Sequence, residues 1–174
     1  AVSTIFNQIV TSPHDKSKWR LLHFNGTSNS EYPALSSFEP GKGYWFLNSS
    51  STNISLGSGS SVQAHPDDLF TITLKIGQNM IGNPYPFTVN WTDVIAHNKT
   101  ASIIVDGDVD VNLNKYNSGY ALSTSLSKFE GAFINASKAV TLEIPIPENA
   151  ASGGRIRTTT ENKVEENIIG SDAW

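Results

Sequence analysis

The sequence predicts an all-β protein: an antiparallel β-sandwich built from two repeated units, with little helix. Three observations favour this fold class. Short apolar or alternating stretches are separated by clusters of Gly, Pro, Ser and Asn, which is typical of strands joined by turns. Only 16% of the residues are charged, so the surface is solvated by hydroxyl and amide groups rather than by ion-paired helices. Finally, two segments of the chain carry similar motifs in the same order.

The clearest strand is 70–76, in which four apolar residues alternate with polar ones and share one face: Phe70, Ile72, Leu74 and Ile76. Further short strands are predicted at 35–38, 43–47, 54–56, 80–81, 109–113 and 140–145. The best helical candidate is a short turn over 93–96, which Asn90 or Thr92 could cap. Strands of this length and spacing predict a sandwich or an open barrel.

The two similar segments indicate a duplication. Phe46–Ser50 aligns without gaps with Phe133–Ser137, and a Phe-Glu pair and a glycine precede each of them. We therefore divide the chain into a first β unit over 1–66, a second, homologous unit over 67–148, and a linker or the start of a following module over 149–174. The first unit has no counterpart of the strand at 70–76, so we expect that its opening strand is missing.

A duplication of this kind makes a specific structural prediction. The segments around 20–57 and 112–143 should superpose strand for strand, with Phe46 on Phe133 and Asn48 on Asn135. The alternative is a chance similarity between Ser-rich hairpins. We also expect the two ends of the chain, including Trp174, to be poorly packed unless a neighbouring domain or chain completes them.

Composition excludes several classes of partner. The net charge is -4 and the pI is near 5.5, so we expect no nucleic acid and no anionic membrane as a partner. No apolar run approaches the roughly 18 residues of a membrane span, so we expect no direct membrane insertion. The chain contains no cysteine, which excludes a disulfide framework and a thiolate site.

The order of several motifs resembles that found in large modular exported proteins of the Bacteroidetes type. The first segment reads Lys18–Leu22, Phe24–Gly26, Tyr32-Pro33 and then Phe38–Phe46. The second is Gly77–Pro86 followed by Trp91, with Gln78 where those proteins usually have an aromatic residue. The final Asp172–Trp174 is similar to the start of the next module. The resemblance implies a secreted or cell-surface location and a β-rich accessory role, and it implies no reaction.

The motif residues also have a direct physical interpretation. Pro40–Gly43 is predicted to form a tight turn, because proline fixes φ and glycine accepts positive φ. A phosphate-binding loop is excluded there, because the required spacing is absent and no helix follows. The tryptophans Trp19, Trp45 and Trp91 are expected in the core. The alternative is that these tryptophans form an aromatic platform for sugar stacking. The exposed aromatic residues that would mark a carbohydrate-binding module are Tyr32, Tyr44, Tyr85 and Tyr120.

The acidic run over 106–112 is the sharpest chemical pattern. Its candidate metal ligands are Asp106, Asp108, Asp110 and Asn112, with Ca²⁺ as the ion, because alternating carboxylates open many calcium loops. However, the glycine and the glutamate that complete an EF-hand loop are absent. The alternative is a strand whose acidic face is solvated and discourages edge pairing.

Catalytic patterns are absent from the sequence. The four histidines, His14, His23, His65 and His97, lack metal-binding spacing, and no G-x-S-x-G elbow occurs. A glycosidase needs two facing carboxylates, for which Glu39 and Glu130 are one pair, but these lie at equivalent places of the repeat. We therefore predict a non-catalytic extracellular module, a spacer or interaction domain whose partners are neighbouring domains or chains. The alternatives are a carbohydrate-binding or adhesive module that takes a polysaccharide, and a fragment of a secreted hydrolase.

Overall fold

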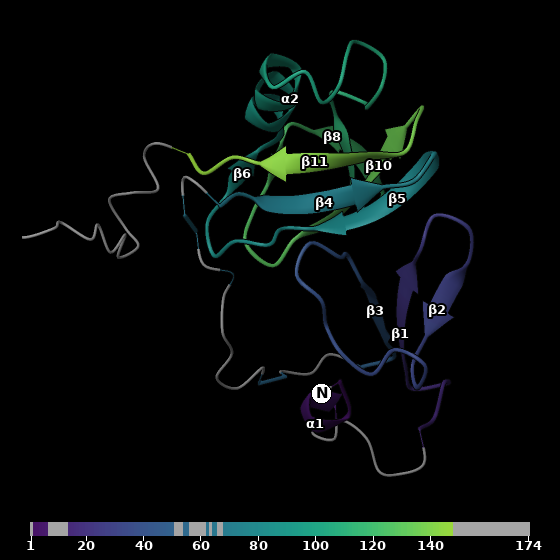
Figure 1. Ribbon diagram of the computed structural model, residues 1–174. Coiled ribbons are helices and arrows are strands. Elements are labelled where there is room, and N and C mark those ends of the chain that lie inside the picture. The colour runs from purple at the N-terminus through teal and green to yellow at the C-terminus, as the bar shows by residue number, and fades with distance from the viewer. Residues whose placement is uncertain are drawn as a thin grey trace, which may run out of the picture.

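A computed structural model describes residues 2–6, 14–50, 54–55, 62, 64–65 and 68–147 (Figure 1). Every paired strand in this part of the chain runs antiparallel to its neighbour, which confirms the all-β prediction. The helices in the same residues are α1 (Val2–Phe6) and α2 (Trp91–Thr100). The predicted linker over 149–174, with Trp174, lies outside the described residues.

The first sheet has the strand order β2-β1-β3, made by Asn29–Glu31, Trp19–Phe24 and Trp45–Asn48. In β1 the alternation is regular: Trp19, Leu21 and His23 are buried on one face, while Arg20, Leu22 and Phe24 are half-buried on the other. The buried face packs against α1 and the partly buried Tyr32 and Tyr44. Val2 and Phe6 of α1 are buried there, so the expectation that this end of the chain is poorly packed was wrong. This small cluster is the core of the first sheet, and it lies in the lower part of Figure 1.

The second sheet has the order β5-β10-β7-β8 and forms most of the larger body. Its strands are β5 (Gly77–Gly82), β10 (Gly131–Ala136), β7 (Leu113–Tyr116) and β8 (Tyr120–Ser123). Two pairs complete the body: β4 (Phe70–Leu74) with β11 (Val140–Ile144), and β6 (Val89–Asn90) with β9 (Ser125–Leu126). The main core fills the space between these strands and α2, with Leu74, Trp91, Leu113, Ile134 and Leu142 almost fully buried.

The strand predicted at 70–76 forms, but it ends two residues early at Leu74. Asn79 is the cause, because its side chain accepts a hydrogen bond from Lys75 N–H and donates to Lys75 O, both at 2.8 Å. This contact turns the chain before Ile76, which is 68% exposed and not on the buried face. The predicted alternation was therefore wrong at its last residue.

Helix α2 is longer than the predicted turn. Asn90 is its cap, as one of the two alternatives proposed, and its side chain accepts a hydrogen bond from Thr92 N–H. The buried Asn98 attaches the helix to β11 by a two-way pair of hydrogen bonds with the backbone of Glu143, at 2.7 and 2.9 Å. The helix thereby covers one side of the main core (Figure 1).

The segment 35–38 forms no strand, which corrects the prediction made there. The chain instead turns after Glu31, whose carbonyl accepts hydrogen bonds from the N–H groups of Ala34 and Leu35. Farther on, the Glu39 N–H donates to the hydroxyl of Tyr44 at 2.9 Å. These turn and side-chain partners take the place of a strand ladder. Residues 54 and 55 also form no strand.

The two sheets meet at a joint that two glycines make possible. The Gly43 N–H donates to Met80 O (3.3 Å), and the Gly82 N–H donates to Gly41 O (2.9 Å). A Cβ atom on Gly43 would lie 2.5 Å from Ile81 O, and one on Gly82 would lie 2.4 Å from Lys42 O. Only glycine allows backbones to approach so closely. The Pro40–Gly43 turn is therefore half of a contact between the sheets.

The predicted duplication stays a prediction. The sheet orders β2-β1-β3 and β8-β7-β10 are equivalent in connectivity and direction. Their registers differ, however. If Phe24 is aligned with Tyr116, then Leu22 is aligned with Asn114. The residue opposite Leu22 is Trp45, and the residue opposite Asn114 is Phe133, so Trp45 is aligned with Phe133. That alignment is one residue away from the proposed match of Phe46 with Phe133.

Candidate functional site

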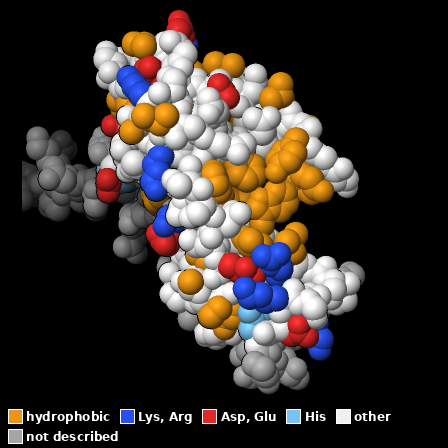
Figure 2. Space-filling model, turned by 90° about the vertical axis from the view of Figure 1, so that its right-hand side faces the viewer, with side chains coloured by type: hydrophobic (Ala, Val, Ile, Leu, Met, Phe, Trp, Pro, Cys, Tyr) orange, Lys and Arg blue, Asp and Glu red, His pale blue; other side chains and the backbone are white. Residues whose placement is uncertain are grey.

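The most distinctive surface feature is an apolar cleft between the outward faces of the two sheets (Figure 2). It contains two adjoining cavities of about 500 and 460 Å³ that share Trp45, Tyr116 and Phe133. On one side stand Leu22, Phe24 and Trp45 of the first sheet. On the other side stand Met80, Phe133, Tyr116 and Leu122 of the second sheet. We refer to this surface as the aromatic cleft.

Strand register explains why these side chains gather. Met80 lies opposite Phe133, Phe133 lies opposite Asn114, and Asn114 lies opposite Leu122, so one row crosses all four strands of the sheet. Directly opposed residues of an antiparallel pair point to the same face. The next pair on the same face of β7 and β8 is Tyr116 with Tyr120, which extends the row toward the first sheet.

The aromatic rings contact one another at steep angles. Trp45 meets Tyr116 edge-on, with the ring centroids 4.9 Å apart and an interplanar angle of 69°. Tyr116 and Tyr120 are 5.4 Å apart at 70°. Such edge-to-face pairs are favourable arrangements of aromatic quadrupoles. The cleft is therefore lined by ring faces in several orientations rather than by one flat platform.

Much of this apolar surface is open to solvent. Tyr116 is 54% exposed, Tyr120 61% and Leu122 70%, although they are neighbours on one sheet face. A contiguous exposed apolar patch on a globular protein marks an interaction site or a ligand groove. β8 adds to this exposure because it is the edge strand of its sheet in the described part of the chain.

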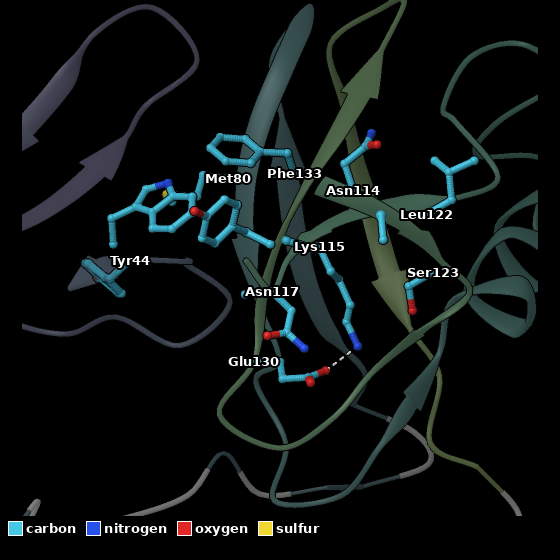
Figure 3. A pocket seen from close by; sticks show the side chains of 14 residues that line it. Tyr44, Met80, Asn114, Lys115, Asn117, Leu122, Ser123, Glu130 and Phe133 are labelled. Carbon is cyan, nitrogen blue, oxygen red and sulfur yellow. Dashed lines mark ion pairs between the residues drawn. The ribbon is translucent and has the colours of Figure 1, made fainter. Parts of the chain in front are cut away.

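One end of the cleft is polar (Figure 3). Lys115 and Glu130 form an ion pair there, and Asn114, Asn117 and Ser123 line the same cavity. Partial burial alone would raise the pKa of Glu130, but hydrogen bonds from Lys115 and from the Ser127 N–H outweigh it, and the pKa is lowered. Glu130 is therefore ionised at neutral pH, and the cleft offers amide, hydroxyl, ammonium and carboxylate groups beside aromatic rings.

The structure separates the four tyrosines that were candidates for sugar stacking. Tyr44 is among the residues that line the cleft, but its ring packs against His23 and Phe38 in the cluster of the first sheet, at 5.4 and 5.0 Å. Tyr120 stands at the rim of the cleft, 6.1 Å from the Phe133 ring. Tyr32 lies instead in the cluster around Trp19, 5.1 Å from that ring. Tyr85 is only 3% exposed, and its hydroxyl donates to Ile144 O at 3.1 Å. Tyr85 was therefore a wrong candidate, because its ring is part of the core.

Sequence reasoning missed Tyr116 and Phe133 as cleft residues, and it expected Trp45 in the core, with sugar stacking as the alternative. Trp19 and Trp91 are buried as predicted, but Trp45 is only half-buried and faces the cleft. A signal for the missed residues exists in the chain, since two tyrosines flank the turn Asn117–Gly119. A hairpin with aromatic residues on both sides of its turn places them on one face.

The acidic run 106–112 forms a turn and not a strand. Gly107 has φ +86°, Val109 is buried and Val111 is 53% exposed, so the predicted single apolar face was wrong. The left-handed glycine breaks the alternation. Asp108 is nearly buried, and its carboxylate accepts hydrogen bonds from Lys138 (2.8 Å) and from the Val105 N–H (2.6 Å). The Lys138 contact, followed by the Val105 contact, lowers the pKa of Asp108.

This arrangement does not gather the proposed calcium ligands. Asp106 pairs with Lys99, Asp108 pairs with Lys138, and Asp110 is exposed, while Asn112 is half-buried at the start of β7. Among the residues that the structure describes, no three acidic or histidine side chains are placed to hold a metal ion. The carboxylates that were expected to face water or an ion thus serve in part to close a turn.

Comparison with known proteins found no protein-family model, no curated protein and no solved structure that matches this chain. In the described part of the chain, neither helix has the length and apolar character that crossing a membrane requires.

Proposed function

We propose that this chain is a non-catalytic binding module of a larger secreted or cell-surface protein, and that the aromatic cleft holds its ligand. The observation that carries the proposal is the exposed row of Tyr116, Tyr120 and Leu122 beside Trp45, because such a row has no structural role in the two cores. The extracellular location rests on the motif resemblance of Lys18–Leu22 and Phe38–Phe46. Neighbouring domains or chains of the same surface protein remain the expected structural partners.

An oligosaccharide is the ligand class that the lining favours. Sugar rings have apolar C–H faces and polar edges, so they need aromatic faces and hydrogen-bonding groups side by side. The cleft provides both, with Trp45 and Tyr116 next to Asn114, Asn117 and the Lys115–Glu130 pair. The steep angles between the rings suit a single bent glycan chain better than a flat crystalline surface.

The electrostatics of the cleft support a non-catalytic role. A general acid for glycoside hydrolysis needs a raised pKa and a second carboxylate facing it. Glu130 is the one acidic residue among the residues lining the cavity of about 500 Å³, and its pKa is lowered. Glu39, the other half of the pair considered from sequence, is bound to Lys42 at 2.6 Å and does not line that cavity.

A glycan-array screen of the chain, followed by calorimetric titration of the glycans that bind, tests the proposal. Tyr116→Ala and Trp45→Ala should each weaken binding by about 30-fold, as expected for aromatic residues at the centre of a binding surface. The matched control is Ile76→Ala, which removes an exposed apolar side chain outside the cleft and should leave affinity unchanged.

Two results would contradict this proposal. One is the absence of binding to any glycan on the array, which would leave a spacer role. The other is glycan binding that Tyr116→Ala and Trp45→Ala do not affect, which would place the site elsewhere on the molecule.

A further inference from the structure

A separate cavity of about 300 Å³ lies beside the joint between the two sheets. Three segments form its wall: the end of β1 at His23–Asn25, the turn Pro40–Lys42, and the β4–β5 hairpin with Thr71–Thr73 and Lys75. The joint holds these segments together through the Gly43–Met80 and Gly82–Gly41 hydrogen bonds. The cavity is therefore a built feature of the fold.

The charge of this cavity is one-sided. Lys42 and Lys75 line it, and no acidic residue does, although the chain as a whole has a net charge of -4. Lys75 forms no ion pair with any described residue. Its stem lies against Gly26, where an added Cβ would be 3.2 Å from Lys75 Cδ. That contact keeps the stem of Lys75 close to the end of β1.

Neutral hydrogen-bonding groups complete the wall. Thr71, Thr73 and Asn25 are among the residues that line the cavity. The Thr73 hydroxyl is hydrogen-bonded to the Thr141 hydroxyl at 3.0 Å, whereas the Thr71 hydroxyl makes no hydrogen bond within the described residues. Hydroxyl and amide donors beside two ammonium groups are the groups that oxyanions prefer. Glu39 weakens the attraction for an anion, because it lies outside the cavity, forms an ion pair with Lys42 at 2.6 Å and neutralises part of the charge of that lysine.

We propose that this cavity binds a small oxyanion, a carboxylate or a sulfate group, between Lys42 and Lys75. The group belongs either to a free anion or to an acidic sugar, since both present the same oxygen atoms. The site is distinct from the aromatic cleft. The two share Phe24 and Met80, but neither Lys42 nor Lys75 lines the cleft. The proposal stands whether or not the cleft binds a glycan.

Nuclear magnetic resonance titration of the ¹⁵N-labelled full chain tests the proposal. Sodium sulfate and sodium glucuronate are added in separate series, with sodium chloride holding the ionic strength constant, because screening weakens any charge interaction. Saturable shifts are expected at the amides of Thr71, Thr73 and Lys75 in at least one series. If only sulfate saturates, the ligand is a sulfate group, and if only glucuronate saturates, it is a carboxylate.

Charge variants make the test specific. Lys75→Gln should weaken binding about tenfold or more, whereas Lys75→Arg should retain it, because only the first removes the charge. Glu39→Gln should strengthen binding by releasing Lys42. The control Lys128→Gln changes the net charge equally at an exposed lysine outside the cavity and should have no effect.

The proposal is overturned if the shifts rise linearly without saturation in both series, or if Lys75→Gln and Lys128→Gln give the same affinity. Tyr116→Ala separates this site from the cleft. That variant should weaken glycan binding by about 30-fold while leaving the anion titration unchanged, so the failure of either site can be recognised independently of the other.

Discussion

Replacing Gly82 with alanine should separate the two sheets. The added Cβ would lie 2.4 Å from Lys42 O and 2.9 Å from Lys42 C, whereas ordinary contacts begin at 3.4 Å. The backbones must therefore move apart by about 1 Å at this point. Such a shift would break the Gly82–Gly41 and Gly43–Met80 hydrogen bonds, which are 2.9 and 3.3 Å long.

The expected cost follows from these two effects. Overpacking against a backbone carbonyl costs about 1–3 kcal/mol, and each lost hydrogen bond contributes about 1 kcal/mol net. We expect Gly82→Ala to lower the free energy of unfolding by about 3–5 kcal/mol, which corresponds to a fall in melting temperature of roughly 6–20 °C for a chain of this size. Thermal and urea unfolding followed by circular dichroism measure both quantities.

Gly119→Ala is the matched control. Nothing lies within 4 Å of a Cβ built on Gly119, and the residue does not need a left-handed backbone. This variant should be neutral or slightly stabilising, because alanine reduces the entropy of the unfolded chain. If Gly82→Ala and Gly119→Ala unfold within about 0.5 kcal/mol of each other, the joint is not the close contact described here.

Three further variants test other parts of the structure. Hydrogen bonds from Arg20 and then Lys16 lower the pKa of Glu31 from 4.5 to about 2. The Glu31 carboxylate therefore stabilises the fold above pH 4.5, and this stabilisation is lost as pH falls toward 2. The difference in melting temperature between wild type and Glu31→Gln should shrink between pH 4.5 and 2, and a constant difference would refute the pairing. Asp108→Ala should lower the melting temperature more than Asp106→Ala, because Asp108 closes a turn while the Asp106 side chain is 92% exposed. Equal effects of the two variants would contradict that role of Asp108. Thermal melts of the wild type with Ca²⁺ and with EDTA should coincide. Phe129 has φ +63° and is 84% exposed, so glycine, but not alanine, should relieve its strained backbone. The Phe129→Gly variant should therefore be about 1 kcal/mol more stable than Phe129→Ala. If the backbone were not strained, unfolding in urea would show Phe129→Ala as the more stable variant.

The fold class was predictable because it depends on local alternation. β4 and β11 show period-2 burial, and period 2 can be read directly from residues such as Ile72 and Leu74. β1 also alternates in burial, but no strand was predicted there, because Leu22 and Phe24 are apolar on its less buried face. Two of the errors occurred where one side chain or one glycine interrupts the alternation. Asn79 ends β4 before Ile76, and Gly107 turns the acidic run, and neither effect is visible in hydrophobic periodicity.

The cleft was only partly predictable because it depends on strands that are distant in sequence. Tyr120 and Tyr44 were candidates, but nothing local distinguishes them from Tyr85, whose ring fills the core. Trp45 and Tyr116 are 71 positions apart in the sequence and meet only because the sheets are joined. The same long-range contact explains the role of Gly82 and of Gly43, which sequence alone suggested only as part of the Pro40–Gly43 turn.

The joint links stability to binding in a way that can be measured. Gly43 directly precedes Tyr44 and Trp45, and Gly82 pairs with Gly131 next to Ala132 and Phe133. A shift of about 1 Å at the joint would therefore change the spacing of Trp45 and Phe133 across the cleft, now 6.4 Å between ring centroids.

A core variant provides the comparison. Leu142→Ala should cost about 2–5 kcal/mol, which is comparable to the cost of Gly82→Ala, but Leu142 is fully buried and lines neither cleft cavity. Well below the melting temperature of each variant, Gly82→Ala should weaken binding in the cleft, whereas Leu142→Ala should leave affinity unchanged. Equal affinities in both variants would mean that the cleft keeps its geometry independently of the joint, and that Trp45 is positioned by β1 alone.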